Sequence, residues 1–411
     1  MASLVGAKGK NPLLTGVAPD CEFIIVKLKE IKKFMIEEFA LYGGTEGRYE
    51  TSDIMFAVRF LTYTASRLKK PIVLYSPLGT NYGPHDGNGI VERSLEITAQ
   101  NTGVIPVASV GNQGDSDTHT SGVIQNTGES KTIEVKIGRL QQNLIFNIWI
   151  DKPNKVSVTV ISPSGENTPN VKARFHESVS HKFIYEGTNM TITIDAPEEA
   201  TGDERIEVKA FGIREGIWQV RLTGDYIVDC KYDAWLPQLS LLAPDTKFLN
   251  SDQFITLTSP STAHSIISAA YYNQNNNFIV PSSGRGYTRD GRIKPDLAAG
   301  GINADVAAVG GGVVKQSGAS VAGAIVAGCC ALMLQWGIVD KNDKNMYMTK
   351  LKTYLIRGTT KRKGDTYPNR ETGYGFINME EVFNSLRCLR GVHGSIYKEY
   401  TIGNLFIRIP E

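Results

Sequence analysis

The sequence predicts an α/β core built on a parallel sheet, interrupted by a module of antiparallel strands. In residues 1–120, apolar strand-like runs alternate with helical patterns, which favours crossover connections between parallel strands. From about residue 122, short runs alternate apolar and polar residues between turn residues, which is typical of an antiparallel sandwich. After about residue 251 the α/β pattern returns. We therefore expect a core in two parts, with a β-sandwich inserted at 121–250.

The first part of the core, residues 1–120, contains three strand-like runs and two helical patterns. Cys21–Leu28 reads as a buried strand, and Thr51–Leu68 has helical apolar spacing behind a Thr or Ser cap. Pro71–Gly79 is a second strand that ends in a glycine turn, residues 88–103 form a second helix, and Val104–Gly114 is a third strand. This order predicts strand–helix–strand units.

Two of the three tryptophans in the inserted module at 121–250, Trp149 and Trp218, lie within its alternating runs. A glycan-binding or protein-binding surface would present such aromatic side chains to solvent. Their positions in the alternation favour core packing instead. We expect a β module whose aromatic residues are buried.

The second part of the core, residues 251–386, begins with the apolar run 264–273 and continues into a glycine-rich loop at 281–301. The apolar stretch Gly318–Val339 follows, and further helices are expected near Asn345–Leu355 and after Gly373. Beyond this part, residues 387–411 form a C-terminal β extension with a terminal hairpin.

Composition excludes several classes of function. Lys and Arg number 44 and Asp and Glu number 42, so the formal charge of +2 indicates neither a nucleic-acid surface nor a polybasic membrane patch. The five cysteines, two of them adjacent at Cys329 and Cys330, contain no CxxC pair and no disulfide framework. We expect no metal, no cofactor and a reducing compartment. The N-terminal residues show no secretory signal, so a cytoplasmic or spore-associated location is expected.

The stretch Gly318–Val339 allows three interpretations. Its length and lack of charge fit a membrane span, but Gly and Ala supply little transfer energy and no Lys/Arg cluster flanks it. Its small residues favour a closely packed core helix. Ser320 at the helix start is either a simple cap or a nucleophile, since free N–H groups and the helix dipole favour an oxyanion beside the hydroxyl.

The segment SGASVAGAIVAGCCALML resembles the serine motif of the subtilisin-like peptidases, through Gly318, Ser320, Ala322 and the VAG at Val326–Gly328. Further segments resemble the same family in the same order: TGVAPDCEFIIVKL, SPLG, VASVGNQG, GRIKPDLAAGG and GYGFIN. The resemblance implies a subtilisin-like parallel sheet with flanking helices and a serine endopeptidase activity.

The resemblance also assigns roles to individual residues. It implies that Ser320 is the nucleophile and that the side chain of Asn112 completes the oxyanion hole. It further implies that substrate backbone binds along four residues of two segments, namely Ser76, Leu78, Gly79 and Gly111. A protein or peptide substrate is the expected partner, with no nucleic acid and no membrane.

The inserted module narrows the resemblance to one group within the subtilisin-like peptidases. A jelly-roll-like domain between the oxyanion Asn and the catalytic Ser is similar to the arrangement in the clostridial Csp germination proteases. Members of that group activate spore cortex-lytic hydrolases by cleaving their pro-forms. The resemblance therefore implies a role in germination.

Three departures from the family pattern affect the expected activity. Ala319 replaces the usual Thr, and Gly300 stands where the family has Pro. The Asp strand and the His-Gly-Thr helix that should precede the GVAP segment are missing, and the chain starts just after the expected position of the His. Without a base, Ser320 is a weak nucleophile, so we expect a nearly inactive, N-terminally truncated chain whose partners include its own missing segment or propeptide.

The sequence offers two other candidate bases, His119 and His393. His119 follows Asn112 and lies near Asp115 and Asp117, although a solvated loop is the expected setting for it. The order Ser, Asp, His of an α/β-hydrolase would use His393. Its Asp would come from one of three candidates, Asp340, Asp343 or Asp365. That fold requires Gly rather than Ala322 at the second position after the serine.

Three functions therefore remain open. The first is an endopeptidase whose N-terminal part is absent from this sequence. The second is a pseudoprotease that binds a partner without cutting it. The third is a binding function of the β module alone. Retention of Asn112 and Ser320 favours the first.

Overall fold

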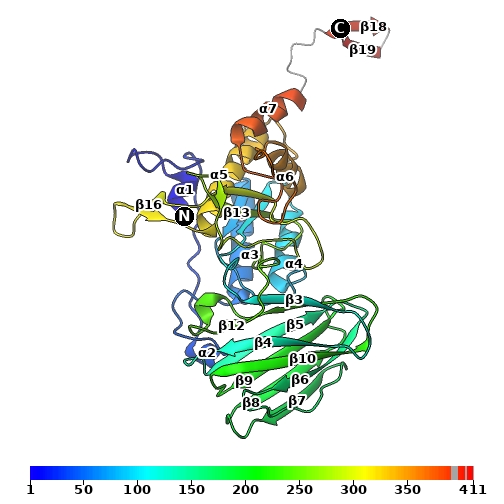
Figure 1. Cartoon of the computed structure of the whole chain (residues 1–411). Coiled ribbons are helices and arrows are strands. Elements are labelled where there is room, and N and C mark those ends of the chain that lie inside the picture. Colours follow the sequence, from blue (N-terminus) through cyan, green and yellow to red (C-terminus); the bar gives the residue numbers. More distant parts are fainter. Residues whose placement is uncertain (390–396, 403–404, 411) are drawn as a thin grey trace.

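The computed structural model of the chain describes residues 1–389, 397–402 and 405–410. The helices are α1 (Ala2–Gly6), α2 (Lys33–Glu38), α3 (Thr51–Leu68), α4 (Ile90–Ala99), α5 (Ala319–Leu334), α6 (Met348–Arg357) and α7 (Met379–Leu389). Figure 1 shows the helices gathered mainly around one parallel sheet, away from a strand-rich part at the other end.

The parallel sheet has the strand order β1-β2-β13-β15. Its strands are β1 (Ile72–Ser76), β2 (Val104–Ser109), β13 (Ile267–Asn273) and β15 (Leu297–Gly300), and β14 (Phe278–Ile279) pairs antiparallel with β13. Strands from both predicted parts of the core therefore meet in one sheet. The expected subtilisin-like sheet with flanking helices is confirmed.

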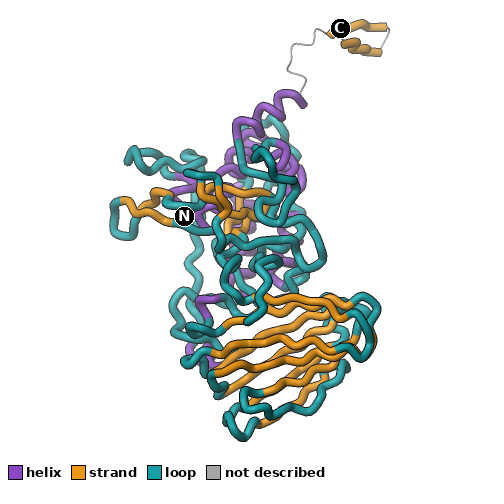
Figure 2. The backbone as a smooth tube through the Cα atoms, viewed as in Figure 1, coloured by secondary structure: helices purple, strands orange, loops and turns teal. Residues whose placement is uncertain are grey.

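Two antiparallel sheets follow β2 in the chain. One has the order β3-β11-β5-β9-β8-β7, and the other has the order β12-β4-β10-β6. Their strands are β3 (His119–Ile124), β4 (Ser130–Ile137), β5 (Asn143–Ile150), β6 (Lys155–Ile161), β7 (Glu177–Lys182), β8 (Asn189–Asp195), β9 (Glu204–Phe211), β10 (Gly216–Tyr226), β11 (Cys230–Trp235) and β12 (Lys247–Phe248). Figure 2 shows them as the orange layers of the lower half.

Remaining strands form two hairpins. Strands β16 (Ala304–Ala307) and β17 (Val313–Gln316) pair just before helix α5. Strands β18 (Tyr397–Ile402) and β19 (Leu405–Pro410) pair near the C-terminus, as the sequence predicted. A single 3-10 turn, Leu239–Leu241, and a π turn, Gln335–Val339, complete the described secondary structure.

Helix α5 is the core helix of the parallel sheet. Ala322, Val326, Cys330 and Met333 are buried against strands β2, β13 and β15. The stretch Ala319–Val339 is long and apolar enough to cross a membrane by length and composition, but two thirds of it is buried inside the fold. Burial of this extent fits the predicted core helix.

The two antiparallel sheets share a hydrophobic core of their own. All buried members of this cluster lie between Ile124 and Phe248, and they include Trp218. Trp149 is also buried, as expected of a core aromatic residue. Arg289, in a loop of the α/β part, links that part to the antiparallel sheets, because its buried guanidinium contacts Asp151 and Asp203 as well as Asp86.

We expect residues 118–250 to fold on their own, because their apolar core contains no residue from the rest of the chain. Expressed alone, this fragment is expected to be monomeric, to show β-rich circular dichroism and to unfold in one cooperative transition. A fragment that stays unfolded under conditions in which the full chain is folded would contradict the insertion hypothesis. The boundaries of the module and its jelly-roll-like character remain predictions.

One predicted element is wrong. Cys21–Leu28 was expected to be a buried strand, but residues 22–29 pair with no described strand. The side chains of Phe23 and Ile25 are 45% and 76% exposed. The local sequence has strand propensity, but a strand also needs a neighbouring edge for its hydrogen bonds.

Candidate active site

Ser320 is the second residue of helix α5, at the end where the helix meets strand β1. Gly318 immediately precedes the helix with φ +128°, a conformation that favours glycine and lets the chain turn from β17 into α5. The hydroxyl of Ser320 donates to Pro77 O over 3.5 Å, which is a weak contact. The main-chain N–H of Ser320 has no acceptor within the helix, because it lies in the first turn.

Asn112 lies beside this helix start although it is far away in the sequence. Its Oδ1 accepts a hydrogen bond of 3.0 Å from the N–H of Ala319, which precedes Ser320. The amide oxygen is thereby turned towards the helix, and Nδ2 has no acceptor among the described residues. An exposed amide with an unused donor therefore lies beside the first turn of helix α5, the turn that carries Ser320.

The segment expected to bind substrate backbone lies at the carboxyl end of β1. Ser76 ends the strand and pairs with Ala108, and Leu78 is half-buried. The carbonyl of Gly79 accepts a hydrogen bond of 2.6 Å from Gln238 Nε2. The segment is therefore held at both ends, while Pro77 between them is exposed.

Gly79 and Gly111 are brought together by Thr258, which sequence reasoning missed. A Cβ at either glycine would clash with the Thr258 side chain, and Gly111 also has φ +85°. Thr258 donates its N–H to Val110 O at 3.0 Å and is 2% exposed. No sequence signal distinguishes this threonine, because its role depends on two loops from other parts of the chain.

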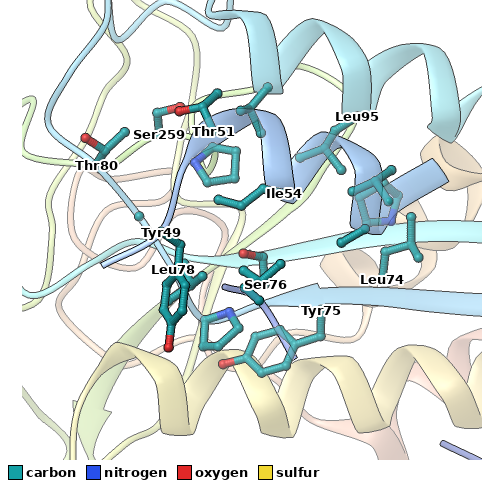
Figure 3. A pocket seen from close by; sticks show the side chains of 18 of the residues that line it. Tyr49, Thr51, Ile54, Leu74, Tyr75, Ser76, Leu78, Thr80, Leu95 and Ser259 are labelled. Carbon is teal, nitrogen blue, oxygen red and sulfur yellow. The ribbon is translucent and has the colours of Figure 1, made fainter. Parts of the chain in front are cut away.

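Tyr75 is a second residue that sequence reasoning missed. Its hydroxyl donates to the main-chain oxygen of Ser320 at 2.6 Å and lies 3.4 Å from Ser109 Oγ. Burial raises the pKa of Tyr75 to about 12, against the smaller opposite effect of these hydrogen bonds. Figure 3 shows Tyr75 pointing from β1 towards helix α5. A tyrosine inside an apolar strand signals a buried hydrogen bond, because its hydroxyl needs a partner.

No described histidine is hydrogen-bonded to Ser320. His85 bonds to main-chain oxygens of Asn81 and Leu257, and burial lowers its pKa to about 4. The others contact carboxylates: His119 contacts Asp233, His176 contacts Asp195, His181 contacts Glu166, and His264 contacts Glu96.

The predicted alternative base, His119, is not in a solvated loop. It is 1% exposed in strand β3, where it stacks on Trp235 and contacts Asp233 at 3.0 Å. The expectation of a loop was wrong, because strand β3 begins at this residue. His393, the other candidate, lies outside the described residues. Of its expected acidic partners, Asp343 pairs with Lys350 and Asp365 with Arg362.

Within the described ranges, no three His, Cys, Asp or Glu side chains are grouped closely enough to hold a metal ion.

Comparisons with known proteins agree with the fold. Residues 248–375, which include Ser320, match the Subtilase family. The structure is similar to the CspB protease of Clostridium perfringens, with a TM-score of 0.79 and 28% sequence identity over 85% of this chain and 73% of that chain.

Further structural similarity is more distant. The self-cleaved protease domain of PatA gives a TM-score of 0.47 at 13% identity, over 95% of this chain and 82% of that chain. No curated protein matches the chain. The subtilase segment and the similarity to CspB together support a serine peptidase.

Proposed function

We propose that this chain, which has the subtilisin-like fold and a subtilase segment at 248–375, is a serine endopeptidase with Ser320 as its nucleophile. The observation that carries the proposal is the hydrogen bond between Asn112 Oδ1 and the N–H of Ala319. It holds an amide donor beside a serine at a helix N-terminus. Acyl transfer needs this combination of nucleophile and oxyanion donors.

The proposed reaction uses the carboxyl end of β1 as a substrate-binding edge. An extended peptide would lie along Ser76, Leu78 and Gly79 and near Gly111, and the Ser320 hydroxyl would attack its scissile carbonyl carbon. Negative charge that develops on the carbonyl oxygen would be stabilised by Asn112 Nδ2 and the main-chain N–H of Ser320. The hydroxyl proton must pass to a base during the attack.

The described residues supply no general base for the Ser320 hydroxyl. Every described histidine has other partners, and none contacts Ser320. This observation favours a second candidate function, that of a pseudoprotease that binds a protein partner without cutting it. For the peptidase, pro-forms of spore cortex-lytic enzymes are the substrate class that the resemblance to the Csp proteases implies.

Labelling with a fluorophosphonate distinguishes the two functions. We expect the 411-residue chain alone to show no labelling above the background of a Ser320→Ala variant. Added imidazole can take the serine proton, so the rate of labelling is expected to rise with imidazole concentration. Ser317→Ala, which removes an exposed hydroxyl just before the helix, is the matched control and should label like the wild type.

The other outcomes are equally informative. Labelling without imidazole that is lost in Ser320→Ala would mean that the chain contains its own base, and His393→Ala would be the next variant. No labelling of Ser320 at any imidazole concentration would contradict the peptidase and leave the pseudoprotease.

A further inference from the structure

Three aromatic rings are stacked where the antiparallel sheets meet the α/β part of the fold. The rings of His85 and His119 both stack on the indole of Trp235, with centroid distances of 4.0 Å and 4.8 Å. All three residues are at most 3% exposed. His119 and Trp235 are paired residues of strands β3 and β11, whereas His85 lies in the loop between β1 and α4. Figure 1 shows β3 on the side of the antiparallel part that faces the helices. This ring stack therefore joins side chains from both parts of the fold.

Each ring of the stack has a nitrogen close to a main-chain oxygen of one loop, residues 252–259. The indole N–H of Trp235 donates to Ile255 O at 3.1 Å. The two histidines of the stack place Nδ1 at 3.2 Å and 2.8 Å from two further main-chain oxygens of this loop, those of Asp252 and Leu257. An imidazole nitrogen donates in only one tautomer, whereas an indole nitrogen is always a donor. Trp235 therefore makes the contact that does not depend on protonation.

The acceptor of the indole N–H, Ile255, has a backbone conformation that needs support. Its φ is +53°, in the left-handed region that a β-branched residue rarely adopts. Such a conformation persists where the surrounding structure holds it in place. The N–H of Ile255 lies 3.4 Å from Gly286 O, which is long for a hydrogen bond, whereas its carbonyl accepts the shorter bond from Trp235. The indole N–H is therefore the stronger of the two contacts that hold this residue.

The far end of the same loop packs against both segments that are proposed to bind peptide. A Cβ on Gly79 or on Gly111 would clash with the side chain of Thr258. Ser259 and Thr80 exchange two main-chain hydrogen bonds of 2.9 Å each. The position of the loop therefore sets how the two segments lie relative to each other.

We propose that Trp235 of strand β11 is a positioning residue for peptide binding, because its N–H fixes the 252–259 loop that holds the two peptide-binding segments. The inference rests on the proposed peptidase function, and it adds that binding of an extended peptide depends on a side chain from the antiparallel sheets. Trp235 is buried, so it acts through Ile255 and Thr258 rather than by touching the peptide. Loss of its N–H should weaken peptide binding and leave the reactivity of the Ser320 hydroxyl unchanged.

Two probes of Ser320 separate binding from reactivity. The first is acetyl-tetra-alanine in which a diphenyl phosphonate replaces the terminal carboxylate, so that a peptide must bind before the reaction. The Ser320 oxygen then attacks phosphorus, a phenoxide leaves and the hydroxyl proton passes to added imidazole. The second is the small fluorophosphonate, which carries no peptide. Labelling rates at rising concentrations of the peptide probe give a half-saturating concentration and a maximal rate.

Trp235→Phe keeps an aromatic ring in the stack and removes the N–H. We expect the half-saturating concentration of the peptide probe to rise by roughly tenfold, as for one lost hydrogen bond. The maximal rate and the labelling by the small fluorophosphonate should stay within about twofold of the wild type. Trp218→Phe is the matched control, because it also removes a buried indole N–H, one that donates to Arg214 O at 3.0 Å inside the antiparallel part. It should leave the half-saturating concentration unchanged.

Hydrogen exchange tests the loop without any labelling of Ser320. In Trp235→Phe, the N–H groups of Thr80, Thr258 and Ser259 should exchange faster by roughly tenfold, because the loop that they join opens more easily. In Trp218→Phe their exchange should match that of the wild type.

Equal half-saturating concentrations for Trp235→Phe and Trp218→Phe would overturn the proposal, and so would unchanged exchange of the loop in Trp235→Phe. A wild type that neither probe labels at any imidazole concentration would instead contradict the peptidase, and the exchange comparison would still decide whether Trp235 fixes the loop. If Trp235→Phe does not fold, exchange in the wild type decides. The indole N–H of Trp235 should then be as well protected as the N–H groups of Thr258 and Ser259, and much faster exchange of the indole would overturn the proposal.

Discussion

Replacing Asp296 by alanine is expected to lower the free energy of unfolding by about 3–5 kcal/mol, because it leaves the buried Lys294 and the half-buried Lys352 without their counter-charge. The Asp296 carboxylate is 3% exposed and lies 2.7 Å from Lys294 Nζ and 2.8 Å from Lys352 Nζ. It also accepts hydrogen bonds from the N–H and hydroxyl of Ser268. The carboxylate thus connects strand β13, the loop that leads into β15 and helix α6.

The same substitution should change the pH dependence of stability. Burial alone would raise the pKa of Asp296, but the charges of Lys294 and Lys352 outweigh it and hold the pKa at about 2. A carboxyl group in an unfolded chain has a pKa of about 3.9. Its folded pKa is the lower one, so this contribution is present above pH ~4 and is lost as the pH falls through ~2.

Urea denaturation of the wild type and Asp296→Ala at neutral pH measures the expected decrease in the free energy of unfolding. Asp305→Ala is the matched control, because Asp305 pairs with the exposed Lys315 at the surface. Surface pairs of this kind contribute under about 1 kcal/mol. If the two variants lower the free energy of unfolding equally, the buried ion pairs of Asp296 contribute no more to stability than the surface pair of Asp305, which contradicts the prediction.

Much of the fold was predictable because it depends on local patterns. The limits of helix α3 and the positions of β1 and β2 agree with the predicted ranges, since apolar spacing acts within one element. The expected Thr or Ser cap is not formed, because the residue before the helix is Glu50 and its side chain makes no capping hydrogen bond. The segment Cys21–Leu28 was the exception. Its residues favour a strand, but pairing depends on whether a neighbouring edge is present, and this information is not local.

The candidate site was predictable where a motif marks it and not elsewhere. Ser320 and Asn112 stand in recognisable segments, and the structure brings them together through Ala319. Tyr75 and Thr258 contact the site from a strand and a loop that carry no motif. Their contribution depends on which chain segments meet, which composition and spacing do not encode.

The Asn112→Ala variant is expected to lower the imidazole-supported rate of Ser320 labelling by roughly 10²–10³, the usual effect of losing one oxyanion donor. Asn112 Oδ1 is bound to the N–H of Ala319, so only Nδ2 is free to face a developing oxyanion. Alanine removes that donor and leaves the hydroxyl of Ser320 in place. The labelling rate should therefore fall at every imidazole concentration.

Two comparisons separate this effect from a structural one. Asn101→Ala removes an exposed amide that bonds only to Thr98 O, and it should label at the wild-type rate. Thermal unfolding of both variants shows whether loss of the Ala319 contact disturbs helix α5. If Asn112→Ala labels as fast as Asn101→Ala while both remain folded, Asn112 positions the helix without stabilising the oxyanion. The main-chain N–H of Ser320 would then be the donor on which the proposed chemistry depends.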